Sequence, residues 1–256
     1  MSQFDNRTMT ILKDYYAKGM QKYDVIAVAL YGSQNYAMDT SNSDVDAYLI
    51  TNIDFESKIA GFHDLEPKSI RCSHGIISIK SLDEYMALLL RHSPNAFEVL
   101  HTKYIIVNPK YKHIWDELAH MKETLVNLDR YRLARVYVGM ANSESRKALA
   151  FQTAPSANQM KATSRAMHAI ETAKRILSGV PFQEAIDAST MPEYDIMMML
   201  KNGIWDNLMK ESIDAMDGRI HELWHPYQTD RPKAVALPAT TIEKLASLIR
   251  TAVSLS

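Results

Sequence analysis

The chain has 256 residues with 29 basic and 30 acidic side chains, a formal net charge of −1 with histidines neutral. This length fits one large domain or two modest ones, and 46% hydrophobic with 23% charged residues argues against global disorder. The near-zero net charge argues against a protein that coats nucleic acid non-specifically. A single cysteine, Cys72, excludes an intramolecular disulfide framework and a zinc site of several cysteines. Without a signal-like start or an apolar run long enough for a bilayer, we expect a cytoplasmic protein that contacts no membrane.

The first part of the chain alternates helix and strand patterns. Helical spacing of apolar residues predicts a helix over residues 5–20. Apolar or alternating runs bounded by turn residues predict strands over residues 25–32, 44–50, 76–80 and 104–108. Ser81 followed by Glu84 is a capping-box pattern that predicts a helix directly after the third of these strands.

From about residue 113 the apolar residues follow helical spacing only. Two long helices are predicted on either side of a connection at residues 153–159, and further helices at residues 182–188, 194–216 and 241–254. We therefore predict an α+β protein, with a small mixed β-sheet domain over residues 1–112 followed by an all-helical domain over residues 113–256. Residues 129–176 carry nine basic and three acidic side chains, so the neutral total hides a basic helical stretch.

One segment carries a recognisable chemistry. The apolar strand ends at Gly32 and Ser33, ten residues intervene, and the next strand opens with Asp44 and Asp46. Side chains two apart on a strand point the same way, so both carboxylates lie on one face. Two such carboxylates suit Mg²⁺ or Mn²⁺, and a glycine-serine turn that starts a helix can hold a phosphate. The pattern predicts a nucleoside triphosphate bound through metal.

This segment resembles the DNA polymerase beta-like nucleotidyltransferases, whose signature is Gly followed by Gly or Ser, a spacer of about ten, and two acids separated by one apolar residue. It is more similar still to the bacterial and phage predicted nucleotidyltransferases with a GSRAYG…SDYD pattern. The residues that match this pattern are Gly32, Ser33, Tyr36, Ser43, Asp44 and Asp46. HSPNAFEVL at residues 92–100 is similar to the NPNxxExL segment of that family, and the later helices are similar more loosely.

The resemblance implies a metal-dependent enzyme that moves a nucleoside monophosphate from a nucleoside triphosphate to a hydroxyl acceptor. It implies that Asp44 and Asp46 are catalytic and hold Mg²⁺ or Mn²⁺, and that Gly32, Ser33 and Ser43 bind the nucleotide. The acceptor stays open among tRNA, another RNA, a protein hydroxyl and a small molecule, and the oligomeric state is not predicted.

The superfamily usually carries a third carboxylate on a later strand, and the strand at residues 76–80 has none. The alternatives are Glu98, which lies in the NPN-like segment, and Asp83, which also suits the first turn of a helix; Asp64 and Glu66 precede the strand. Because this acid is missing, a second hypothesis stays open. In it the chain is a catalytically weakened nucleotidyltransferase fold that acts as a binding, regulatory or antitoxin-like protein.

Basic residues recur at helical spacing in the second half. Lys161, Arg165, His168 and Arg175 fall within one stripe of a helix, as do the residues Arg135, Asn142 and Arg146 of the helix before it. We predict that Lys161, Arg165 and His168 contact phosphates of the nucleotide or of an RNA acceptor. Ordinary solvated helix faces are the alternative.

A competing motif is His221-Glu222-Leu223-Trp224-His225, which has the H-E-x-x-H form of a zinc protease helix. Pro226 follows directly and is expected to end the helix at the second histidine. No third histidine follows at the extended spacing, so a zinc metalloprotease is the remote alternative.

Overall fold

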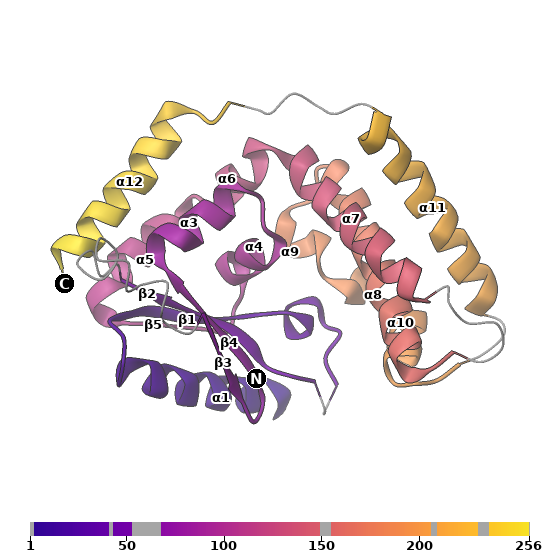
Figure 1. Cartoon of the computed structure of the whole chain (residues 1–256), viewed down its shortest axis with the longest axis horizontal. Helices are drawn as coiled ribbons and strands as arrows, with labels where there is room; N and C mark the ends of the chain where they lie inside the picture. Colours follow the sequence, from indigo (N-terminus) through magenta and orange to yellow (C-terminus); the bar gives the residue numbers. More distant parts are fainter. Residues whose placement is uncertain are drawn as a thin grey trace. The chain divides into compact units, whose positions relative to one another are not determined.

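The computed structural model describes residues 3–40, 43–52, 68–148, 155–205, 209–229 and 236–255. It confirms the α+β class, with a mixed five-stranded sheet and its helices followed by a mostly helical region (Figure 1). The chain divides into two compact units. The sheet unit comprises residues 1–35, 41–125 and 236–256, and the helical unit comprises residues 36–40 and 126–235. The sequence predicted one boundary, after residue 112. In the structure the main part of the helical unit begins at residue 126, and the C-terminal helix belongs to the sheet unit.

Five strands form the sheet of the sheet unit. They are β1 (Val25–Tyr31), β2 (Asp46–Thr51), β3 (Ser69–Cys72), β4 (Gly75–Ser81) and β5 (Ile105–Val107). Their order is β3-β4-β2-β1-β5, in which β2 and β4 are parallel and the other neighbours antiparallel. The four predicted strands are confirmed, whereas β3 was not predicted.

The two faces of β2 have different environments because side chains alternate along a strand. Val45, Ala47 and Leu49 pack in the core together with Leu12 and Tyr15. The last two belong to α1 (Gln3–Met20), which covers this face of the sheet (Figure 1). Asp44, Asp46 and Tyr48 therefore share the opposite face.

Helices cover that opposite face. The helices of the sheet unit after β4 are α3 (Leu82–Leu90), α4 (Pro94–His101), α5 (Lys112–His120), α6 (Lys122–Leu128) at its boundary, and α12 (Ala239–Ser254). Tyr48 of β2 meets Tyr85 of α3 edge to face, with ring centroids 6.3 Å apart. The N–H of Ser81 donates to Glu84 (3.2 Å), in agreement with the predicted helix start. The helix α4 was not predicted.

The C-terminal helix is anchored in the sheet unit by polar contacts. Asn52, just after β2, donates from Nδ2 to the carbonyl of Ala252 over 2.9 Å and to the hydroxyl of Tyr111 over 3.1 Å. Lys244 also forms an ion pair with Glu117 of α5, at 3.2 Å. The contacts of Ala252 and Lys244 with residues far earlier in the sequence explain why α12 groups with the sheet.

The helical unit contains α7 (Arg130–Ala148), α8 (Ala157–Leu177), α9 (Phe182–Ala185), α10 (Tyr194–Lys201) and α11 (Met209–Thr229). Two predictions about these helices are wrong. The single helix predicted over residues 194–216 is interrupted at Asn202 and Gly203, where Gly203 has φ +77°. In contrast, α11 continues through Pro226 to Thr229, so this proline does not end it.

Candidate functional site

The turn after β1 is built on a glycine conformation. Gly32 has φ +101°, in the left-handed region where a Cβ is unfavourable. A short 3₁₀ helix, Ser33–Tyr36, follows, and the N–H of Asn35 donates to the Gly32 carbonyl over 2.9 Å. Among the described residues, no heavy atom beyond the chain neighbours lies within 4 Å of the position that a Cβ on Gly32 would take. The turn is therefore held in a defined shape with open space beside it.

A buried carboxylate holds the turn from α4. The N–H of Gly32 donates to Oε2 of Glu98 over 2.9 Å, and Glu98 is only 1% exposed. Asn35 adds a second tie, because its Nδ2 donates to the Leu30 carbonyl (3.1 Å) while its Oδ1 accepts from the Thr102 hydroxyl (2.6 Å). Glu98, one of the two predicted candidates for the third acid, thus contacts the glycine-serine turn itself.

Asp44 and Asp46 lie at the start of β2, beside this turn. Tyr31 and Asp46 are directly opposite each other in the antiparallel β1–β2 pairing, and Gly32 follows Tyr31. Gln34 donates from Nε2 to the carbonyl of Asp44 over 2.7 Å, which joins the 3₁₀ helix to the acidic segment. Asp44 is exposed and Asp46 half-buried. The strand pairing therefore brings together the two halves of the predicted motif.

The start of β4 supports Asp46. The N–H of Ile76 donates to Oδ1 of Asp46 over 2.9 Å, and the N–H of Val45 donates to the carbonyl of His74 over 2.6 Å. Gly75 lies between them with φ +152°, and a Cβ there would lie 2.4 Å from the Val45 carbonyl oxygen and 3.0 Å from Asp46 Oδ1. Only glycine allows this close approach. Sequence reasoning did not single out Gly75, although a glycine directly before a strand is a usable signal.

The face of β4 beside the acids carries no carboxylate. In the parallel β2–β4 register Ser78 is opposite Tyr48, so Ile76, Ser78 and Lys80 share the face of Asp46. The Ser78 Oγ lies 3.5 Å from the Tyr31 hydroxyl. Among the described residues no group of three His, Cys, Asp or Glu side chains could hold a metal ion.

The other predicted candidates for a third acid have different positions. Asp83 lies in the first turn of α3, where it accepts a hydrogen bond from the Ser81 hydroxyl over 2.6 Å. This agrees with the alternative prediction, that Asp83 belongs to the first turn of a helix. Asp64 and Glu66 lie outside the described residues. Among the described residues, the carboxylates that remain at the turn as possible metal ligands are those of Asp44 and Asp46. Their oxygens suit Mg²⁺, which proteins bind through one or two carboxylates together with substrate phosphates.

Tyrosines line the buried side of this face. The rings of Tyr31 and Tyr48 meet edge to face at 5.0 Å. The pKa of Tyr48 is raised to about 12, mainly by burial and to a smaller extent by the charges of Tyr31 and Glu98. Burial likewise raises the pKa of Tyr31. Both phenols are therefore protonated at neutral pH and can donate hydrogen bonds but not accept a proton from a substrate.

The basic stripe on α8 divides into two parts. Lys161 and Arg165 are exposed, whereas His168 is 6% exposed with Nε2 2.8 Å from the Ile186 carbonyl, to which it donates. Burial lowers the pKa of His168 to about 4, so it carries no charge at neutral pH. His168 therefore offers no cation to a phosphate, and of the predicted phosphate contacts only Lys161 and Arg165 present charge to solvent. On the preceding helix α7, Arg146 is exposed and Arg135 partly so.

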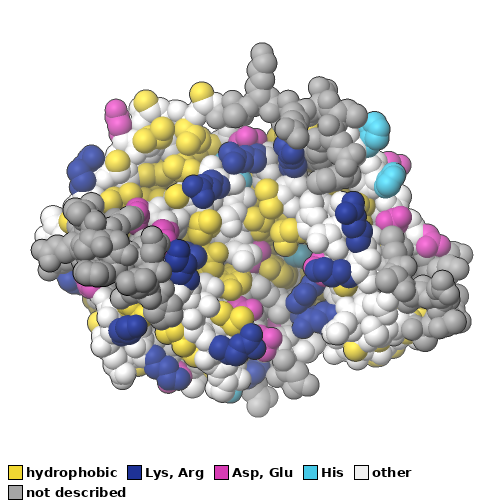
Figure 2. Space-filling view, viewed as in Figure 1, with side chains coloured by type: hydrophobic (Ala, Val, Ile, Leu, Met, Phe, Trp, Pro, Cys, Tyr) yellow, Lys and Arg dark blue, Asp and Glu magenta, His cyan; other side chains and the backbone are white. Residues whose placement is uncertain are grey.

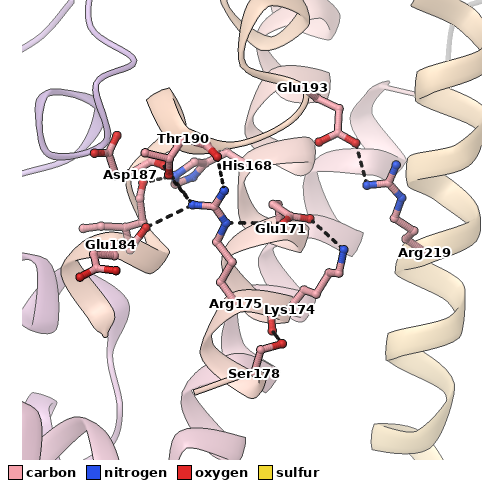
Figure 3. A network of polar contacts seen from close by, with 11 residues as sticks. His168, Glu171, Lys174, Arg175, Ser178, Glu184, Asp187, Thr190, Glu193 and Arg219 are labelled. Atoms are coloured by element: carbon pink, nitrogen blue, oxygen red, sulfur yellow. Dashed lines mark hydrogen bonds and ion pairs between the residues drawn. The ribbon is translucent and has the colours of Figure 1, made fainter. Parts of the chain in front are cut away.

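Arg175, the last member of the stripe, is engaged within the helical unit (Figure 3). Its guanidinium donates to both Oγ1 and O of Thr190 (2.6 Å each) and to the carbonyls of Glu184 and Asp187 (3.3 and 3.4 Å). It also lies 3.5 Å from Oε1 of Glu171. This residue joins α8 to the loop before α10 and is structural.

The H-E-x-x-H segment shows no metal site in the part of the chain that the structure describes. His221 and His225 are exposed on α11, and no third ligand completes a group with them there. Glu222 lines a cavity of about 290 Å³ with Ile170, Glu171, Lys174, Arg219 and Leu223. Its cations are already paired, Arg219 with Glu193 at 2.8 Å and Lys174 with Glu171 at 3.7 Å.

The surface agrees with the charge arithmetic. On the face drawn in Figure 2, Lys and Arg side chains lie singly or in small groups among hydrophobic and other side chains. This is unlike the continuous basic surface of a protein that coats nucleic acid. None of the helices in the described ranges is both long and apolar enough to cross a lipid bilayer.

Comparisons with known proteins give similarities to solved structures but none to a family model or curated protein. Among solved structures, a nucleotidyltransferase-like protein from Exiguobacterium sibiricum 255-15 is similar over 98% of this chain and 76% of its own, with 11% sequence identity and a TM-score of 0.31. Because the TM-score is this low, the similarity does not indicate a function for this chain.

Proposed function

We propose that this protein is a metal-dependent nucleotidyltransferase that moves a nucleoside monophosphate from a nucleoside triphosphate to a hydroxyl acceptor. One observation carries the proposal: the β1–β2 pairing places Tyr31 opposite Asp46, so that the Gly32–Ser33 turn and the acidic pair lie side by side. The link from Gln34 to the Asp44 carbonyl supports the same arrangement. An open, glycine-dependent turn beside two carboxylates on one face suits a triphosphate that reaches the protein partly through a cation.

The residues have distinct roles in this proposal. Asp44 and Asp46 would hold Mg²⁺ or Mn²⁺. The backbone N–H and hydroxyl of Ser33 would bind phosphate oxygens, and Ser43, half-buried just before Asp44, would add a hydroxyl. When bound, the metal would neutralise charge on the transferring phosphoryl group and on the pyrophosphate that leaves. The acceptor hydroxyl oxygen would form a bond to the α-phosphorus as the bond to pyrophosphate breaks, and the hydroxyl proton would pass to water.

The N–H of Gly32 is not available to a phosphate, because it already donates to Glu98. Glu98 therefore acts as a positioning residue that fixes the turn. An RNA, tRNA included, is the acceptor that we favour, because the helical unit carries exposed cations on α8 that suit phosphates.

The test is an incubation with α-labelled nucleoside triphosphates, Mg²⁺ or Mn²⁺, and a panel of RNA, protein and small hydroxyl acceptors. The wild-type protein is compared with Asp44→Ala/Asp46→Ala and with a control pair of equal charge change, Asp14→Ala/Asp116→Ala, whose carboxylates make exposed helical ion pairs. We expect label transfer by the wild type and the control, and a loss of at least about a hundredfold in the first variant. Transfer that survives without Asp44 and Asp46 would contradict the mechanism.

The absent carboxylate on the acidic face of β4 favours a second candidate, a weakened enzyme that acts as a nucleotide-binding, regulatory or antitoxin-like protein. Ser78 and Lys80 occupy that face, and Glu98 is engaged with Gly32. This candidate predicts nucleotide binding that depends on Asp44 and Asp46 but no transfer to any acceptor. Equilibrium binding measured beside the transfer assay separates the two candidates.

A further inference from the structure

Two cations on α8 lack acidic partners. Lys161 and Arg165 are one helical turn apart and both exposed. In the part of the chain that the structure describes, neither forms a hydrogen bond or ion pair with another residue. Lys174 and Arg175, further along the same helix, both pair with Glu171. The first half of α8 therefore presents unneutralised positive charge in a protein whose charges otherwise balance.

A third cation joins them from α10. The hydroxyl of Ser164 donates to the carbonyl of Met197 over 2.9 Å, which fixes α8 against α10, and Lys201 lies one turn after Met197. The pKa of Lys201 is lowered to about 8, first by burial and then by the charge of Lys161, with a smaller contribution from Arg165. The three cations are thus close enough to repel one another.

The segment at residues 36–40 completes this part of the helical unit. The ring of Tyr36 stacks on the imidazole of His168, with centroids 4.5 Å apart and planes at 24°. The Tyr194 hydroxyl donates to the Ala37 carbonyl (3.0 Å), and Nζ of Lys201 donates to the Met38 carbonyl. Asp39 is the acidic group that acts on Lys201, and it favours the charged form. Among the described residues that act on Lys201, one carboxylate and two further cations leave an excess of positive charge.

We propose that Lys161, Arg165 and Lys201 form a binding site for phosphate ester groups, with the Tyr36–His168 stack holding the segment against which Lys201 is fixed. A phosphate would relieve the repulsion among the cations, and a guanidinium with two ammonium groups suits its oxygens. The proposal rests on the proposed function only for the identity of the ligand, which would be the backbone of a polynucleotide acceptor or the polyphosphate tail of the nucleotide.

The test uses a fluorescein-labelled single-stranded oligouridylate, followed by anisotropy without divalent metal, and competition by sodium tripolyphosphate. Wild-type protein is compared with Lys161→Gln/Arg165→Gln and with the control Lys13→Gln/Lys18→Gln, which makes the same charge change on α1. We expect the first variant to bind at least roughly tenfold more weakly, and its salt dependence to fall by about 0.7 for each of the two lost contacts. The control should match the wild type, and thermal unfolding checks that each variant is folded.

The competition identifies the source of the phosphate. Displacement by tripolyphosphate at concentrations comparable to those of the oligonucleotide assigns the site to a nucleotide tail, whereas weak displacement assigns it to a polynucleotide backbone. If wild-type protein binds neither probe, or if Lys161→Gln/Arg165→Gln binds as tightly as the control, the proposal is wrong. Binding that needs Lys161 and Arg165 without any transfer in the assay of the preceding section would uphold the site and overturn the nucleotidyltransferase.

The affinity should also depend on pH. Lys201 binds the anion in its charged form, so affinity is highest below pH 8 and weakens as the pH rises through about 8. The groups that act on it are Lys161 and Arg165 from α8 and Asp39 from the neighbouring segment. Affinity that is level from pH 7 to 9 would exclude Lys201 from the site.

Discussion

The backbone N–H of Gly32 donates to Oε2 of Glu98 over 2.9 Å, and Glu98 is 1% exposed. A residue 66 positions away along the chain therefore fixes the turn on which the candidate nucleotide site depends. A buried carboxylate requires hydrogen-bond donors, because its desolvation is otherwise costly. The Gly32 N–H provides one of these donors, so the shape of the turn and the burial of Glu98 are mutually dependent.

Replacing Glu98 separates a positioning role from a metal-binding role. Glu98→Ala should lower the free energy of unfolding by about 1–3 kcal/mol, because the N–H of Gly32 loses its buried acceptor. Glu98→Gln keeps an acceptor oxygen and should stay within about 1 kcal/mol of wild type with most of its transfer activity. Urea denaturation measures the free energy of unfolding of the two variants, and the transfer assay measures their activity. A Glu98→Gln protein that is as stable as wild type but inactive would identify Glu98 as the missing third acid.

Gly75 should tolerate no side chain. In Gly75→Ala the Cβ would lie 2.4 Å from the Val45 carbonyl oxygen, a backbone atom that cannot move aside without disturbing Asp46. We expect a loss of stability of about 2 kcal/mol or more together with loss of transfer. The matched control is Gly218→Ala in α11, where a Cβ meets no atom of the described residues within 4 Å and helix propensity should add about 0.5–1 kcal/mol. A Gly75→Ala protein with wild-type stability would contradict this packing.

His168 should make the protein less stable in mild acid. Its pKa is about 4 in the folded state and near 6.5 when unfolded. The unfolded chain therefore takes up the proton first, so the stabilisation is complete above pH 6.5 and is lost as the pH falls from 6.5 to 4, by roughly 3 kcal/mol at most. The difference in urea midpoint between wild type and His168→Gln should shrink over this range. A difference that is constant between pH 7.5 and 4.5 would show that His168 titrates normally.

Replacing Arg175 with alanine should lower the free energy of unfolding much more than replacing its neighbour Lys174. Arg175 joins α8 to the carbonyls of Glu184 and Asp187 and to Thr190, so its loss removes several hydrogen bonds from a charged donor and should cost about 1.5–3 kcal/mol. Lys174 makes one exposed ion pair, with Glu171 at 3.7 Å, and its removal should cost less than about 0.5 kcal/mol. Thermal unfolding of the two variants compares them directly, and equal losses would refute the structural role of Arg175.

Features that depend on local pattern were predictable from the sequence. The strands at residues 25–32 and 44–50 have strong apolar patterns, and period-two alternation was enough to place Asp44 and Asp46 on one face. The helix start at Ser81 followed from a two-residue capping pattern. The strand β3 (Ser69–Cys72) is only four residues long and mostly exposed, so its polar-apolar alternation is too short for hydrophobic patterning to reveal it.

Features that depend on contacts between distant residues were not predictable in this way. The burial of His168 and the engagement of Arg175 are set by residues 184–190, whereas helical spacing shows only that the stripe lies on one side of α8. Gly75 matters because of the Val45 carbonyl, thirty positions earlier. The continuation of α11 through Pro226 likewise overrides a local signal, since a proline only disfavours the helical conformation of the residue before it.

The most direct test of the central claim needs no knowledge of the acceptor. Binding of Mn²⁺ is followed by electron paramagnetic resonance with a non-hydrolysable nucleoside triphosphate, for wild type, Asp44→Asn/Asp46→Asn and the control Asp14→Asn/Asp116→Asn. We predict nucleotide-dependent Mn²⁺ binding by the wild type and the control, and its loss in the first variant. Mn²⁺ and nucleotide binding that is unchanged when Asp44 and Asp46 are replaced would contradict the account.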